Sequence, residues 1–73
     1  MTSETLRFAV EMGKKPKRSY PVAEMAEILG FHVDFLRREN KAGRLKFVMP
    51  RGKERGAHIT CDEADRWIAE NSI

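Results

Sequence analysis

The spacing of apolar residues predicts two short helices near the middle of the chain. Between Pro21 and Leu29, apolar residues recur at i, i+3, i+4 and i+7, which is typical of a helix that buries one face. Pro21 suits the first turn of this helix, and Gly30 suits its end. A second helix is predicted over residues 33–42, where Gly43 ends it. Two helices joined by a short turn that contains glycine predict a helix-turn-helix.

The second predicted helix has two unlike faces. Its apolar residues are Phe35, Leu36 and Ala42. Its polar residues recur at i, i+3, i+4 and i+7 and therefore fall on one side of the helix. This polar stripe consists of Asp34, Arg37, Arg38 and Lys41.

A β-hairpin is predicted after the second helix. Leu45–Met49 and Ala57–Thr60 are short runs with β-branched and aromatic members, as strands usually have. The residues between them, PRGKERG, read as a loop longer than a two-residue turn. Positive charges on Arg51, Lys53 and Arg55 give the predicted hairpin a basic tip.

A last helix is predicted from Thr60 to about Asn71. Thr60 and Glu63 have the spacing of a capping box, and Trp67 is expected to be the largest core side chain. The order of elements is then helix, turn, helix, basic hairpin, helix. We therefore predict a mainly α fold with a small β-hairpin, the winged helix-turn-helix.

The N-terminal part of the chain gives conflicting signals. In residues 1–12, apolar and polar residues alternate as in a half-buried strand although the residue types favour a helix, and we expect a weak strand or a loosely ordered arm. The next stretch, GKKPKRS, reads as an exposed basic linker. We therefore expect a flexible basic arm over residues 1–19 and one domain over residues 20–73. The cations of the arm are Lys14, Lys15, Lys17 and Arg18.

Charge is unevenly distributed along the chain. The whole chain carries a net charge of +3, whereas residues 13–58 hold 12 positive and 5 negative side chains, a balance of +7. Such segregation favours a surface that binds a polyanion. The alternative is a solvated basic surface that has no partner.

Length and cysteine usage restrict the function further. A chain of 73 residues has room for one small core and none for a deep catalytic cleft, so we expect no enzyme. Cys61 is the only cysteine, which excludes an internal disulfide and a cysteine zinc cluster and fits a cytoplasmic setting. His32 and His58 do not complete a metal site, and we expect no metal or other cofactor. No apolar run approaches the ~20 residues of a membrane span.

The polar stripe suits contacts with double-stranded DNA. An arginine fork pairs with guanine through two hydrogen bonds, and lysine contacts phosphate as a point charge. Arg37, Arg38 and Lys41 are therefore candidates for contacting base edges and phosphates. Asp34 either accepts a hydrogen bond from a cytosine amino group or stabilises the helix N-terminus. The alternative is a solvated face on which Asp34 and Arg38 form an i, i+4 ion pair.

The remaining cations suggest contacts with the DNA backbone. Arg51, Lys53 and Arg55 would lie near phosphates or enter a minor groove, as the wing of such a protein does. The basic arm would follow the sugar-phosphate backbone. For both groups the alternative is a solvated segment that only keeps the chain in solution.

A series of short segments runs through the chain in a fixed order: Tyr20–Ala26, Leu29–Phe31, Leu36–Arg38, Gly43–Leu45, Ile59–Thr60 and Trp67–Ile68. This series resembles the excisionase-like and MerR-like winged helix-turn-helix proteins, and the resemblance covers residues 20–70. Some positions depart from the family pattern. Pro21 stands where that family usually has serine or threonine, and His32 stands where it has serine. Glu39 and Asn40 stand where apolar or aromatic residues are more usual.

The resemblance implies a sequence-specific DNA-binding protein without catalytic activity. The function that it favours is that of an excisionase, a recombination directionality factor that binds and bends DNA to direct excision by an integrase. The implied partners are double-stranded DNA, an integrase, and further copies of the chain side by side on DNA. One alternative is a small transcriptional regulator, a repressor or activator, of a phage or mobile element. Another is a protein-interaction or DNA-packaging adaptor whose basic face binds an acidic partner.

Overall fold

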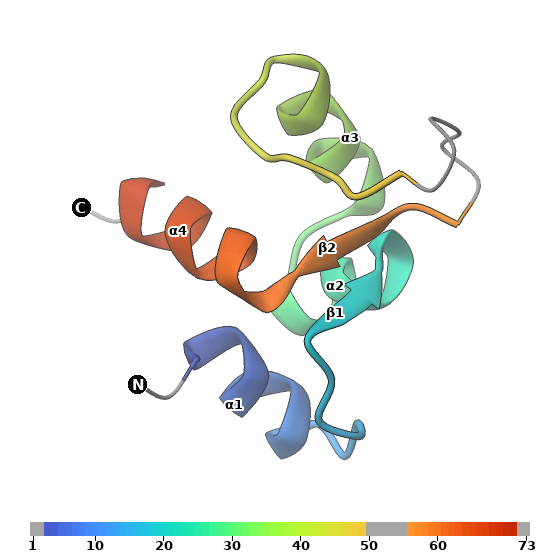
Figure 1. The fold of residues 1–73 in the computed structure, drawn as a ribbon, viewed down its shortest axis with the longest axis vertical. Coiled ribbons are helices and arrows are strands. Elements are labelled where there is room, and N and C mark those ends of the chain that lie inside the picture. The colour runs from blue at the N-terminus through green and yellow to red at the C-terminus, as the bar shows by residue number, and fades with distance from the viewer. Residues whose placement is uncertain (1–2, 50–55, 72–73) are drawn as a thin grey trace.

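The computed structural model describes residues 3–49 and 56–71, which form a mainly helical unit with a small two-stranded antiparallel sheet (Figure 1). The helices surround the sheet, and α3 lies at the opposite end of the molecule from α1 (Figure 1). The elements are α1 (Glu4–Glu11), β1 (Ser19–Pro21), α2 (Val22–Leu29), α3 (Val33–Lys41), β2 (His58–Thr60) and α4 (Cys61–Asn71).

The predicted helix pair is confirmed as α2 and α3. Gly30 ends α2 in the left-handed conformation with φ of 77°, which glycine adopts without steric cost. Pro21 precedes α2 without a side-chain cap, whereas His32 caps α3 because its Nδ1 accepts a hydrogen bond from the Asp34 backbone N–H at 3.2 Å. Histidine therefore does at this helix start what serine does in a usual N-cap.

The sheet pairs strands that the hairpin prediction did not join. β1 pairs with β2 in antiparallel register, with Tyr20 opposite Ile59, and a strand at residues 19–21 was not predicted. The predicted hairpin between residues 45–49 and residues 57–60 is reduced to one bridge, in which Val48 and His58 exchange hydrogen bonds of 2.7 and 2.9 Å. The extended-strand prediction is therefore wrong for most of residues 45–49, of which only Val48 pairs with β2, on the edge that β1 does not occupy.

The expectation of a weak strand or loosely ordered arm is wrong for Glu4–Glu11, which form α1. The Ser3 side chain caps this helix by accepting from the Leu6 backbone N–H at 3.1 Å. Thr5 and Ala9 are four residues apart on one helical face, and both are fully buried. The apparent alternation of the sequence therefore concealed a helical face that contacts α2 and α4.

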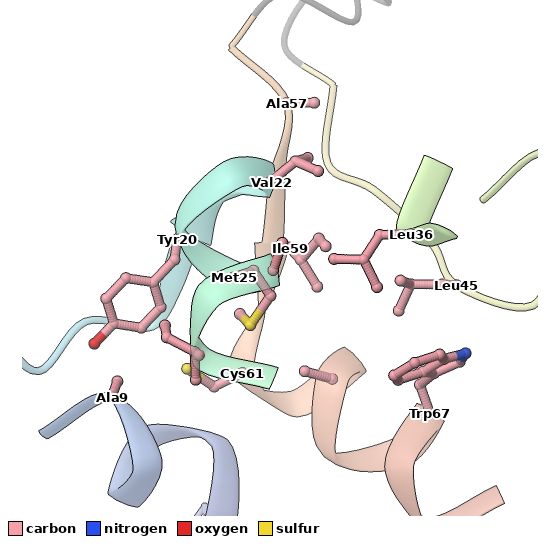
Figure 2. Close-up of a cluster of buried hydrophobic side chains, with 13 residues drawn as sticks. Ala9, Tyr20, Val22, Met25, Leu36, Leu45, Ala57, Ile59, Cys61 and Trp67 are labelled. Atoms are coloured by element: carbon pink, nitrogen blue, oxygen red, sulfur yellow. The ribbon is translucent and has the colours of Figure 1, made fainter. Parts of the chain in front are cut away.

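One hydrophobic core joins all four helices and both strands. Trp67, expected to be a large core side chain, is 3% exposed. Because Ala9 of α1 belongs to the same core, the expected domain boundary at residue 19 does not separate α1 from the rest of the fold. The core consists of Ala9, Tyr20, Val22, Met25, Ala26, Ile28, Leu36, Leu45, Ala57, Ile59, Cys61, Ala64 and Trp67 (Figure 2).

Hydrogen bonds also attach the segment between α1 and β1 to the core. The Tyr20 hydroxyl donates to the Lys15 carbonyl at 2.6 Å and accepts from the Lys17 backbone N–H at 3.2 Å. At the start of α4, the Cys61 backbone N–H donates to the Arg18 carbonyl at 2.8 Å. The Cys61 thiol donates to the Lys17 carbonyl with Sγ 3.3 Å from the oxygen. This basic segment therefore follows the surface of the domain.

Candidate nucleic-acid interface

The polar stripe of α3 lies on its outer face. Leu36 and Glu39 are the buried residues of this helix and turn toward the core. The stripe residues Asp34, Arg37, Arg38 and Lys41 are all exposed, as expected for positions on the opposite side of an α-helix. The structure thus brings the four predicted contact residues together on one accessible surface.

Ion pairing differs along this stripe. Asp34 lies 3.9 Å from Arg37 and 3.6 Å from the His32 ring, so its arginine neighbour is Arg37 and not Arg38 as the alternative interpretation had it. Asp34 is also in the first turn of α3, where a carboxylate stabilises the helix dipole. Within residues 3–49 and 56–71, the Arg38 and Lys41 side chains form no ion pair. Their charges therefore face solvent.

The apolar side of α3 is only partly as predicted. Leu36 is fully buried, but Phe35 is 38% exposed and Ala42, which caps the helix C-terminus, is exposed. Phe35 and Phe31, which is 45% exposed, cover the Trp67 ring with ring-centre distances of 6.1 and 5.4 Å. Phe35 and Ala42 were wrongly assigned to the buried face. The residue that is buried beside Leu36 on that face is Glu39.

Glu39 is a buried carboxylate at the contact between α3 and α4. Its side chain is 7% exposed. One oxygen accepts from the Trp67 indole Nε1 at 3.0 Å, and the other accepts from Arg44 Nε and Nη2 at 2.9 and 2.6 Å. These hydrogen bonds, first those from Arg44 and then that from Trp67, hold the pKa of Glu39 below its ordinary value. The sequence held two signals for this arrangement: a tryptophan N–H, which needs a partner when buried, and the place of Glu39 at a position where the resembled family more usually has an apolar or aromatic residue.

The segment that follows α3 is attached to both helices that flank it. The Asn40 side chain donates to the Leu45 carbonyl at 2.9 Å. From α4, Arg66 donates to the Arg44 carbonyl at 2.9 Å, and Glu63 accepts from the Lys46 backbone N–H at 2.9 Å. The start of the predicted wing is therefore fixed relative to α3.

The predicted capping box at the start of α4 is present in one direction. The Thr60 hydroxyl accepts from the Glu63 backbone N–H at 3.0 Å. The Glu63 carboxylate bonds Arg66 and the Lys46 backbone. The hydrogen bond from Arg66 outweighs partial burial and lowers the pKa of Glu63. The glutamate therefore connects α4 to the residues that follow α3.

The predicted wing cations Arg51, Lys53 and Arg55 lie outside the described residues. Residues 44–49 provide two cations that the sequence analysis did not assign to a site: Arg44, which pairs with Glu39, and Lys46, whose side chain is exposed. The position of Lys46 five residues after Lys41, the last residue of the stripe, and just past Gly43 was the available signal.

The cations of the predicted arm do not join the α3 surface. Lys14 is only 20% exposed and lies 3.7 Å from Glu24 and 3.6 Å from Glu27 of α2. Lys15, Lys17 and Arg18 are exposed, but their segment lies at the α1 end of the molecule, away from α3 (Figure 1). The two groups of cations would have to contact different stretches of a partner.

Among residues 3–49 and 56–71, no three histidine, cysteine or acidic side chains are grouped so as to hold a metal ion. No helix formed by these residues is both long enough and apolar enough to cross a membrane.

Comparisons of the chain with protein-family models, with curated proteins and with solved structures found no match.

Proposed function

We propose that the chain is a sequence-specific double-stranded DNA-binding protein of the winged helix-turn-helix type, with α3 in the major groove. The observation that carries this proposal is the outer face of α3, where Arg38 and Lys41 are exposed beside Arg37 on the second helix of a helix-turn-helix. Arginine in this position pairs with guanine edges, and lysine with phosphate.

The dimensions of α3 suit this role. Its 9 residues span roughly 14 Å at 1.5 Å per residue, and a major groove of about 12 Å width admits one helix. Lys46 follows α3 closely in sequence and would contact the flanking phosphates. The proposed footprint on one DNA molecule is therefore a few base pairs under α3 and backbone contacts beside it.

Among DNA-binding proteins, we favour an excisionase, and this finer proposal rests on the resemblance of residues 20–70 to that family. Its partners would be an integrase and further copies of the chain on adjacent sites. A small transcriptional regulator would use the same surface. DNA that flanks the coding region is the appropriate probe, because binding to several adjacent sites with bending supports an excisionase, and one unbent operator supports a regulator.

Replacing Arg38 by alanine tests the α3 surface. We expect Arg38→Ala to weaken binding to the preferred site by ~1–3 kcal/mol and to relax base preference, as measured by fluorescence anisotropy on the site and on its single-base variants. Arg7→Ala is the matched control because Arg7 is an exposed arginine of α1, at the other end of the molecule, and its loss should leave base preference unchanged.

Salt dependence tests the proposal as a whole. Several phosphate contacts should make the logarithm of the binding constant fall steeply and linearly with the logarithm of salt concentration. If the unaltered protein binds no duplex DNA at low salt, the proposal is wrong and an acidic protein partner becomes the better candidate.

A further inference from the structure

Glu39 joins three parts of the fold through one carboxylate. It belongs to α3, it accepts from the Trp67 indole of α4, and it binds the guanidinium of Arg44. Arg44 begins residues 44–49, here named the wing segment. Backbone hydrogen bonds strengthen this connection, since the N–H groups of Arg44 and Leu45 donate to the Glu39 carbonyl at 3.0 and 3.3 Å.

A buried carboxylate is a costly way to fill space between two helices. Removing a charge from water costs several kcal/mol, and a well-packed apolar residue is often equally good or better for stability. Leucine at this position would fill a similar volume without the desolvation cost of a charge, but it would leave the buried Trp67 N–H without an acceptor. Leucine would lack the directional bonds to both Trp67 and Arg44, so the carboxylate contributes a defined geometry and not only packing.

The geometry that Glu39 defines includes an exposed cation. Arg66 of α4 bonds the Arg44 carbonyl from the other side, and Glu63 bonds the backbone N–H of Lys46. The Lys46 side chain itself is exposed. Its distance and direction from the α3 stripe therefore depend on residues that Glu39 fixes.

We infer that Glu39 is a positioning residue that sets the wing segment, and with it Lys46, relative to α3 so that both contact the same DNA duplex. This inference rests on the proposed function, because it assumes that α3 binds DNA. Glu39 itself is buried against Trp67 and contacts no DNA. It acts through Arg44 and Lys46.

A double-mutant cycle between Glu39 and Lys46 tests this role in the full chain. Lys46→Ala should lower the log-log salt slope of DNA binding by about 0.9, the value of one phosphate contact. Glu39→Leu should lower the slope by a similar amount while base preference at the α3 positions persists. The double variant should lose no more than either single one, since coupled residues are not additive.

Glu39→Gln is the nearest isostere, because it removes the same charge and keeps one acceptor oxygen, whereas the carboxylate uses one oxygen for Trp67 and the other for Arg44. We expect its slope and affinity to lie between those of the unaltered protein and Glu39→Leu, because one of the two contacts keeps its acceptor. The single tryptophan gives one indole N–H signal in an NMR spectrum, which should shift in Glu39→Leu, where the acceptor is lost, and shift less in Glu39→Gln if the amide oxygen accepts from Trp67. This signal verifies the contact without DNA.

Three results would overturn the inference. A Glu39→Leu variant that keeps the full slope would show that the wing segment does not depend on the carboxylate. Losses of affinity that add up in the double variant, with an unchanged slope, would assign Glu39 to folding alone. The same conclusion would follow if Glu39→Leu does not fold and Glu39→Gln binds more weakly with a normal slope. If instead the unaltered protein binds no DNA, the proposed function itself fails.

Discussion

The Tyr20 hydroxyl is one of the groups that attach the basic segment between α1 and β1 to the core. The Tyr20 side chain is 1% exposed, yet its oxygen makes one hydrogen bond as a donor to Lys15 and one as an acceptor from Lys17. Buried phenol groups need such partners. The aromatic ring therefore supplies hydrophobic contact while its tip determines where the N-terminal segment lies.

Removing this hydroxyl should destabilise the fold without disturbing the core. Tyr20→Phe leaves the Lys15 carbonyl and the Lys17 N–H without their partner, and we expect the free energy of unfolding to fall by about 1 to 3 kcal/mol. Urea unfolding followed by Trp67 fluorescence measures the loss. An unchanged midpoint would mean that water replaces the hydroxyl in both hydrogen bonds.

Single residues are also where the sequence was least informative. Glu39 follows two arginines in a polar stretch, so local pattern gives it an exposed position. Its actual partners lie 5 and 28 residues further along the chain, beyond a glycine turn and in another helix. Only tertiary packing brings the Trp67 indole and the Arg44 guanidinium to the same carboxylate.

At the scale of elements, helices were easier to predict than strands. The apolar spacing and terminal residues of α2, α3 and α4 are local signals, and all three helices form close to the predicted positions. β1 and β2 are three residues each and pair across almost 40 positions of sequence, so neither strand had a local indication of its partner. For α1, the helical preference of the residue types was the better guide than their alternation.

α1 is attached to α4 by a carboxylate. Asp65 accepts hydrogen bonds from the Thr5 backbone N–H at 3.0 Å and from the Thr5 hydroxyl at 2.7 Å. Burial acts to raise the pKa of Asp65, but hydrogen bonds from Ser3 and Thr5 together outweigh it, and the pKa lies below its ordinary value. The ionised form of Asp65 is therefore the form that the folded state favours.

This lowered pKa predicts a contribution of Asp65 to acid sensitivity. Because the folded state favours the ionised form, its stabilisation is complete above the unfolded pKa of about 3.9 and is lost as the pH falls through the lower folded value. Thermal unfolding measured from pH 7 to pH 2 should show this loss of stability at the acid end.

Asp65→Asn separates this carboxylate from Glu39 and Glu63, whose pKa values are also lowered. The variant should be less stable than the unaltered protein at pH 7, and the difference should shrink at the acid end. A difference that stays constant with pH would contradict the assignment.

At the scale of the whole molecule, charge differs between α3 and α4. The outer face of α3 has an excess of positive charge, whereas α4 contains Asp62, Glu63, Asp65 and Glu70 against one arginine. Such an asymmetric charge distribution turns a small protein so that its positive surface approaches a polyanion first. The charge segregation visible in the sequence is therefore also a segregation in space for α3 and α4, although the arm cations lie apart from it.

The reactivity of the buried Cys61 thiol reports how often this part of the fold opens. The thiol lies where the start of α4 meets the segment of residues 13–18, 5% exposed and bonded to the Lys17 carbonyl. Burial, aided by nearby Asp65 and Asp62, raises the pKa of Cys61, so a thiol reagent finds neither access nor thiolate in the closed form.

Modification of Cys61 should therefore proceed only through transient opening of the contact between α4 and residues 13–18. We expect labelling by a disulfide reagent to be much slower than in the urea-unfolded chain and to accelerate in Tyr20→Phe, which loosens the same segment. Rapid labelling of Cys61 in the native protein would show that this contact does not shield the thiol. The rate of this one reaction at a native residue thus measures how often the segment of residues 13–18 separates from the start of α4.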